Sequence, residues 1–270
     1  MTAVSNEYAD LTPLQARIQA HRMYSEVADD PDGEIRALLG VPAALDMLDI
    51  GCGTGEFLRT LAAQRHSGLL VGVDTSAEAI CATRSAAGVI AMRASATELP
   101  FPEQAFDCVT ARHMLYHVDD PREALREARR VLRLGGRFVA TVNHREVVPR
   151  TRDMVASVVR DAGLEPRNQL TNGVNSETLP PLLQETFGGV HTAWFDNALV
   201  FPSAASLSTF AVALMSFCGV EQSSPLRDAL AEEISARAEH WFAKHPGASW
   251  RDIKGYTVCS AVRRPSAVLS

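Results

Sequence analysis

Three glycines, Gly51, Gly53 and Gly55, alternate with other residues in the stretch "DIGCGTGE" from Asp49 to Glu56. Glycine has no Cβ, so a loop of this kind lets the backbone come close to a bound molecule. A short apolar run precedes the loop and a helical pattern follows it, which places backbone N–H groups and a helix N-terminus beside that molecule. The spacing therefore predicts a binding loop for a small molecule.

The charges around the loop favour a cationic ligand over a phosphate. A dinucleotide loop reads G-x-G-x-x-G, but Glu56 stands where its last glycine would be, and the Gly-Lys-Ser/Thr of a nucleotide triphosphate loop is absent. Asp49 adds a second carboxylate just before the loop. S-adenosylmethionine has a sulfonium, an α-ammonium and no phosphate, so it fits these acids. The alternative is a tight strand-to-helix turn with solvent-facing acids.

Asp74 ends the next apolar segment of the chain. An acid at this place can accept hydrogen bonds from both hydroxyls of a ribose. It can also help to cap the helix that follows, and one aspartate can do both. Thr75, with Glu78 three residues later, has the pattern of a capping box for that helix.

Histidines after two later segments are candidate general bases for a proton transfer. If residues 112–118 form a helical turn, His113, Tyr116 and His117 share one face. His144 follows the fifth predicted strand. Two histidines four residues apart also occur in zinc sites, but the glutamate of H-E-x-x-H is missing, so we expect no metal. For His117, a packed side chain is the favoured interpretation.

An alternation of strand and helix patterns positions these residues. Apolar segments predict five strands, at residues 47–50, 69–74, 88–94, 105–111 and 137–142. Helical patterns lie between them, so we expect right-handed crossovers and an α/β fold with a doubly wound, mostly parallel sheet. Segments 190–201 and 255–264 add two strands, for seven in all.

The pattern divides the chain into three parts. Residues 1–45 are expected to form an N-terminal helical lid, residues 46–144 the cofactor-binding α/β core, and residues 145–270 the remainder of the sheet. Helical insertions at 145–175 and 203–246 are expected to cover the substrate, because ligands bind at the carboxyl edge of such sheets. The residues expected in the lid are Tyr8, Arg17, His21, Tyr24 and Tyr116, and the alternative for the first four is a surface helix packed on the sheet.

Several aromatic residues and a methionine lie in the C-terminal part. They either line an apolar substrate pocket or form the core of the inserted helices. They are Trp194, Phe195, Phe201, Phe210, Met215, Phe217, Trp241 and Trp250.

Composition excludes several other classes of protein. The chain has 270 residues, 46% of them apolar and 21% charged, with a formal charge of -6, so it does not favour nucleic acid. Its five cysteines have no metal-ligand spacing, which is typical of reduced thiols in a cytoplasmic protein. No secretory signal and no apolar run of ~18 residues is present, so no membrane association is expected. The sequence makes no prediction of oligomeric state.

Four segments together resemble the class I S-adenosylmethionine-dependent methyltransferases. They are "DIGCGTGEFL", "VGVD", "ATELPFPEQAFDCV" and "HMLYHVDDPREALREARRVLRLGGRFVATVN", in this order, over residues 45–143. The small-molecule branch, which includes the ubiquinone and menaquinone methyltransferases, is the most similar. The resemblance implies a Rossmann-like methyltransferase fold and methyl transfer to a small organic molecule, such as a natural product in biosynthesis, with O-methylation favoured over N- or C-methylation.

The resemblance also implies roles for individual residues. Asp49 would orient the ammonium of the cofactor and Asp74 would bind the ribose. The family usually has Gly-Asp-Ala before Leu-Pro-Phe, whereas this chain has Ala94-Ser95-Ala96, so a hydroxyl replaces the acid that accepts from the adenine amine. The implied cofactor-binding residues are Asp49, Gly51, Gly53, Gly55, Asp74, Thr75, Ser95, Ala96 and Arg112.

Two other functions stay open at this point. Because Ser95 replaces an acid and no base is unambiguous, the chain can also be a cofactor-binding protein of this fold with a non-methylating or regulatory role. A nicotinamide oxidoreductase is less favoured, since Glu56 replaces the glycine that a dinucleotide loop needs.

Overall fold

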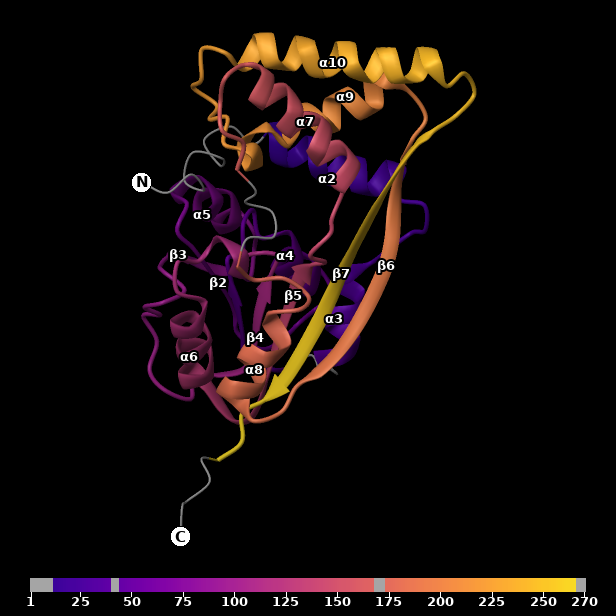
Figure 1. Ribbon diagram of the computed structural model, residues 1–270. Coiled ribbons are helices and arrows are strands. Elements are labelled where there is room, and N and C mark those ends of the chain that lie inside the picture. The colour runs from indigo at the N-terminus through magenta and orange to yellow at the C-terminus, as the bar shows by residue number, and fades with distance from the viewer. Residues whose placement is uncertain (1–11, 40–43, 168–172, 266–270) are drawn as a thin grey trace. The chain divides into compact units, whose positions relative to one another are not determined.

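The computed structural model describes residues 12–39, 44–167 and 173–265, which fall into two compact units (Figure 1). The core unit holds the described residues of Asp30–Val142, Gly173–Trp194 and Tyr256–Ser270. The helical unit holds those of Met1–Asp29, Asn143–Asn172 and Phe195–Gly255. The predicted insertions contribute helices to the helical unit, and their role as a substrate cover stays a prediction.

Seven strands form one sheet with the order β3-β2-β1-β4-β5-β7-β6. The first five pair in parallel. Two hydrogen bonds show that β7 runs antiparallel to β5. Gly135 N–H donates to the Arg263 carbonyl, and His144 N–H donates to the Gly255 carbonyl. This confirms the predicted mostly parallel α/β sheet. The strands are β1 (Met47–Ile50), β2 (Leu70–Asp74), β3 (Ile90–Arg93), β4 (Phe106–Arg112), β5 (Leu132–Asn143), β6 (His191–Phe201) and β7 (Trp250–Val262).

Helices follow the strands of the core unit. Helix α6 begins with Pro121 in its first turn, and the Asp120 carboxylate caps it by accepting from Glu123 N–H at 2.9 Å. The helical elements of the core unit are α3 (Pro31–Leu39), α4 (Glu56–Ala63), α5 (Ala77–Arg84), η1 (Leu115–His117), α6 (Pro121–Val131) and α8 (Leu179–Phe187). Those of the helical unit are α2 (Thr12–Tyr24), α7 (Pro149–Asp161), α9 (Ala204–Ala213), η2 (Met215–Cys218) and α10 (Arg227–Lys244).

The cap of α5 differs from the prediction. The Ser76 hydroxyl, not Thr75, accepts from Ala79 N–H at 3.1 Å, and it donates to the Glu78 carboxylate at 2.9 Å. The predicted Thr75–Glu78 capping box is therefore wrong. Its register is shifted because the helix begins at Ala77, one residue later than that pattern requires.

Two central strands of the core unit are buried along their whole length. Every residue of β1 and β2 is buried, as expected for a parallel sheet covered on both faces. Leu48 and Ile50, on either side of Asp49, are at most 2% exposed. Each such side chain contributes roughly 1.5–3 kcal/mol on burial. The apolar neighbours therefore fix the strand end from which the glycine loop departs.

The aromatic residues of the helical unit mostly form its core. Phe201 and Phe210 are at most 1% exposed and their rings lie 5.2 Å apart. Phe217 and Trp250 belong to the same buried cluster. This confirms, for these residues, the alternative in which they pack the inserted helices. Among the helices of the described ranges, none combines the length and apolar character that a bilayer span requires.

Candidate functional site

The glycine loop joins β1 to α4 in a conformation that glycine alone adopts readily. Gly51, Gly53 and Gly55 have φ of +66°, +54° and +75°. A Cβ on Gly51 would lie 2.7 Å from the Met114 side chain, and one on Gly55 would lie 2.6 Å from Thr83. A Cβ on Gly53 would meet no atom within 4 Å. Packing therefore requires the outer glycines, whereas the middle one faces open space in which a ligand has room.

Asp74 holds the loop from the neighbouring strand. One carboxylate oxygen accepts from Gly53 N–H at 2.9 Å and the other from Ser76 N–H at 2.9 Å. The residue is 6% exposed, and burial raises the pKa of its carboxyl group against the effect of these hydrogen bonds. Each carboxylate oxygen has a second lone pair. Asp74 thus orders the turn and keeps acceptor capacity for a ribose, which stays its predicted role.

Asp49 and Arg112, both predicted as cofactor residues, contact each other. Asp49 is fully buried, and its oxygens accept from Arg112 Nη2 at 3.1 Å and Nε at 3.3 Å, and from the Thr110 hydroxyl at 2.7 Å. Arg112 Nη1 also donates to Asp32 at 2.8 Å, and its guanidinium lies 4.4 Å above the Phe57 ring. Asp32 was missed from the sequence, since no spacing relates α3 to the end of β4.

These charges agree with a cationic ligand. Two carboxylates, Asp32 and Asp49, surround the single guanidinium of Arg112, so the cluster carries a net negative charge when all three are ionised. Asp74 adds a further carboxylate at the loop. The sulfonium and ammonium of S-adenosylmethionine therefore fit the residues present, and a pyrophosphate does not.

The segment after β3 offers hydroxyl groups where the family has an acid. Ser95 Oγ lies 2.8 Å from Thr97 Oγ1 and accepts from Thr97 N–H at 3.2 Å. Thr97 was not predicted, although it follows Ser95 by two residues as in a serine turn. The next residue, Ala96, is 7% exposed. The carbonyl of Thr75 accepts from Arg93 Nε at 2.8 Å. Their contacts with the cofactor stay predictions.

His113 follows directly after β4 in a strained conformation. Its φ is +49°, and its N–H donates to the Thr141 carbonyl at 2.8 Å. Residues 112–118 do not form one helical turn, because this left-handed residue separates the strand from η1, which begins only at Leu115. The condition for a shared face of His113, Tyr116 and His117 is therefore not met. Non-glycine residues of this kind concentrate at functional sites. The His113 ring lies 6.4 Å from the ring of Tyr256, which sequence reasoning missed.

The other candidate bases have different surroundings. Tyr116 and His117 form an edge-to-face pair with centroids 4.5 Å apart, which agrees with a packed His117. His144 belongs to the helical unit, where its Nδ1 lies 3.4 Å from an Asp196 oxygen. A Cβ on Gly255 would lie 2.3 Å from that same nitrogen, so the ring rests directly on the β7 backbone. A role for His144 beside the cofactor stays a prediction.

The predicted lid residues of α2 pack within the helical unit. Arg17 Nη1 donates to the Ala213 carbonyl at 3.0 Å. His21 meets Phe210 edge-on at 6.0 Å, and the Tyr24 ring lies 5.2 Å from that of Phe201. Tyr8 lies outside the described residues. The lid function is therefore still a prediction.

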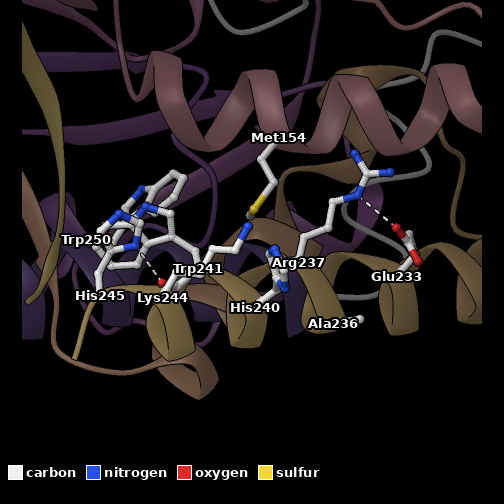
Figure 2. Close-up of a pocket in the computed structure, with 9 residues that line it drawn as sticks. All are labelled: Met154, Glu233, Ala236, Arg237, His240, Trp241, Lys244, His245 and Trp250. Atoms are coloured by element: carbon white, nitrogen blue, oxygen red, sulfur yellow. Dashed lines mark hydrogen bonds and ion pairs between the residues drawn. The ribbon is translucent and has the colours of Figure 1, made fainter.

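A separate pocket of about 570 Å³ lies along α10 in the helical unit (Figure 2). Trp241, Trp250 and His245 gather at one end, where Trp241 stacks on His245 at 4.4 Å. The Arg150 guanidinium lies 4.1 Å from the centroid of the Trp250 ring. Of these rings, that of Trp250 is buried, whereas His245 is exposed. The pocket is lined by Met154, Glu233, Ala236, Arg237, His240, Trp241, Lys244, His245 and Trp250.

Comparison with known proteins identifies the loop-bearing segment. Residues 48–140 match the family model described as "Methyltransferase domain". The chain is 40% identical over 103 residues to a demethylmenaquinone methyltransferase of Roseiflexus castenholzii, covering 37% of this chain and 43% of that protein. It is 36% identical over 112 residues to the O-methyltransferase resE of Aspergillus sclerotiorum, covering 39% and 42%. The match thus spans about two fifths of these relatives.

Solved structures extend the likeness in fold to the whole chain. The crystal structure of the cyclase SpnF superposes with a TM-score of 0.58 at 18% identity, covering 98% of this chain and 97% of that one. At this identity the likeness shows the fold alone. With the family match and the glycine loop, it confirms the resemblance drawn from the sequence. Residues 48–140 therefore match a methyltransferase domain, and the whole chain shares the fold of the solved structure.

Proposed function

We propose that the protein is an S-adenosylmethionine-dependent methyltransferase that modifies a small organic molecule, with oxygen as the favoured acceptor atom. The left-handed loop with its open side at Gly53, held by Asp74 and flanked by net negative charge, carries this proposal. The two curated relatives support it in part, since one is named an O-methyltransferase and the other a methyltransferase of demethylmenaquinone. A natural product is the class of acceptor we favour.

The chain's own residues would bind the cofactor in three places. The open side of Gly53 receives the methionine part, the free lone pairs of Asp74 accept from the ribose, and the hydroxyls around Ser95 meet the adenine. When bound, S-adenosylmethionine supplies a methyl group whose bonding pair returns to sulfur as the acceptor's lone pair forms the new bond. Holding the two reactants close and in line accounts for much of the rate of such a displacement.

His113 is the base that the geometry favours. It follows directly on Arg112, which is bound to Asp49 at the foot of the loop, and it is fixed by its backbone hydrogen bond to Thr141. An alcohol or phenol acceptor loses a proton as its oxygen is methylated, and the His113 imidazole would take that proton. General bases of this kind contribute typically 10²–10⁴-fold to a rate.

Two measurements test the proposal. Calorimetric titration with S-adenosylmethionine, S-adenosylhomocysteine and NAD should show binding of the first two and none of the third. Incubation with methyl-labelled cofactor and an extract of the host's small molecules should transfer label to a product that mass spectrometry identifies as a methyl ether.

Other outcomes would select the alternatives. Binding of NAD alone would favour a nicotinamide oxidoreductase. Cofactor binding without label transfer to any small molecule would favour a non-methylating or regulatory protein of this fold. Label on nitrogen or carbon would keep the enzyme class and overturn only the choice of acceptor atom.

A further inference from the structure

Arg112 connects four elements of the core unit. Its Nε and Nη2 atoms donate to Asp49 in β1, and its Nη1 atom donates to Asp32 in the first turn of α3. The flat face of its guanidinium lies over the ring of Phe57 in α4. Its own position is the end of β4. Three nitrogen donors and one face of the guanidinium are thus engaged by the protein, so few of its N–H groups remain to bind a ligand.

The two carboxylates of this cluster differ in exposure. The Asp49 side chain is fully buried, whereas that of Asp32 is 34% exposed. Burial opposes the charge of Arg112, but the ion pairs with Asp49 and Asp32 outweigh it and raise the pKa of the guanidinium. Arg112 therefore stays positively charged, and its charge balances that of one of its two carboxylate partners. The second carboxylate is left as surplus negative charge in this cluster, of which Asp49 lies two residues before Gly51 in the chain.

We infer that Asp32 is a specificity-determining residue, which acts through Arg112 and Asp49 to make the loop favour the sulfonium cofactor over its neutral thioether product. This inference rests on the proposed function. Arg112 is then a positioning residue, not a cofactor contact, because its donors hold the two acids. Without Asp32 the Arg112–Asp49 pair would be neutral, and the cluster around Arg112 would lose its surplus negative charge.

The expected effect follows from the difference between the two ligands. S-adenosylmethionine and S-adenosylhomocysteine share every group except the methyl and the charge on sulfur. A charge in the protein that is near the loop but partly exposed changes the affinity for a cation by about threefold, since solvent screens it. The neutral sulfur of the product does not feel this charge. Loss of Asp32 should therefore change the ratio of the two affinities, which a general loosening of the loop would not do.

The test is the ratio of dissociation constants for the two ligands, measured by calorimetry at low salt on the full chain. Asp32→Asn should weaken S-adenosylmethionine binding about threefold relative to S-adenosylhomocysteine. Glu34→Gln is the matched control. Glu34 is an exposed acid in the same first turn of α3, so this substitution removes the same charge as Asp32→Asn does. It should leave the ratio unchanged. Asp32→Glu should restore most of the wild-type ratio.

The outcomes separate this inference from the proposed function. An unchanged ratio in Asp32→Asn, with wild-type binding of both ligands, overturns the inference and leaves the proposed function standing. An equal loss for both ligands also overturns it, since Asp32 would then act on the structure or on the ammonium group that both ligands carry. If the wild-type protein binds neither ligand, both the inference and the proposed function fail. A shift in Asp32→Asn that 1 M salt abolishes supports the electrostatic mechanism.

Discussion

One carboxylate oxygen of Asp74 accepts a hydrogen bond from the backbone N–H of Gly53 at 2.9 Å. The residue that ends β2 thus holds the middle of the loop that follows β1. Because Gly53 lies in the left-handed region with φ of +54°, this hydrogen bond fixes a conformation that most residues avoid. The conformation of the loop and the orientation of the predicted ribose acceptor are therefore set together.

Gly53→Ala should abolish most cofactor binding while the protein stays folded. The left-handed backbone makes alanine cost about 1–2 kcal/mol of unfolding free energy. Its methyl group would point into the open space beside the loop, where the cofactor needs room. We expect affinity for S-adenosylmethionine to fall by about tenfold or more, since overpacking a site costs about 1–3 kcal/mol. Calorimetry and chemical denaturation measure the two effects.

Gly135→Ala is the matched control for this change. Gly135 has φ of +80°, and an added Cβ there would also meet no atom within 4 Å. The backbone strain should therefore be similar, yet the residue lies in β5, outside the glycine loop. Cofactor affinity should stay at the wild-type value. Equal losses of affinity in the two variants would show that strain, and not occupation of the ligand's space, is responsible.

Much of the core unit could be predicted because its signals are local. The apolar run at 47–50 and the glycines after it determine a buried strand and a left-handed loop within a few residues, and the structure has both. The seven-stranded sheet follows from the repeated alternation of strand and helix patterns. Even here the ends shift, since β7 begins at Trp250 rather than at residue 255.

The partners of the loop could not be predicted because they are distant in sequence. Asp49 pairs with Arg112 and, through it, with Asp32, and no periodicity relates three residues so far apart. The turn after β4 was misjudged for another reason. His113 and His117 have helical spacing, but the left-handed backbone of His113 removes it from the helix. Such a backbone is uncommon outside glycine, and although histidine is enriched there, a single histidine does not predict it.

Ser95→Asp should strengthen cofactor binding by about three- to tenfold, because a carboxylate accepts from the adenine amine with charge assistance. In the wild-type protein, Ser95 Oγ lies at hydrogen-bond distance from Thr97 Oγ1, at 2.8 Å. The control ligand is S-inosylhomocysteine, in which a carbonyl replaces the amine. A hydroxyl can donate to that carbonyl and an ionised carboxylate cannot, so the variant should bind this analogue more weakly than the wild type does. Parallel changes for both ligands would place residue 95 away from the adenine.

His113→Asn should lower kcat by about 10²-fold or more and leave cofactor affinity unchanged. Asparagine tolerates the left-handed backbone, with φ of +49° at this position, so the substitution removes the imidazole with little added strain. His117→Asn is the comparison, since His117 packs against Tyr116 and should affect stability more than turnover. Steady-state kinetics with the acceptor found in the labelling assay measure both. Full activity in His113→Asn would exclude it as the base.

Alkylation at pH 8 should modify Cys81 alone among the five cysteines. Cys81 is exposed, whereas the other four are buried. Burial, assisted by the nearby carboxylates of Asp49 and Asp74, raises the pKa of the Cys52 thiol in the glycine loop to about 12. A raised pKa keeps the thiol protonated at pH 8, and the thiolate is the reactive form. Burial likewise raises the pKa of Cys108, Cys218 and Cys259 to about 11.

Mass spectrometry after brief treatment with iodoacetamide should find one adduct on the native protein and five in guanidinium chloride, and Cys81→Ser should abolish the native adduct. Modification of Cys52 in the native state would mean that the loop opens to solvent. Two hydrogen bonds to β2 oppose this opening, since Cys52 N–H and Gly51 N–H donate to the Val73 carbonyl at 3.0 and 2.8 Å. Cofactor affinity should therefore survive the treatment in the wild-type protein, because the reagent reacts outside the loop.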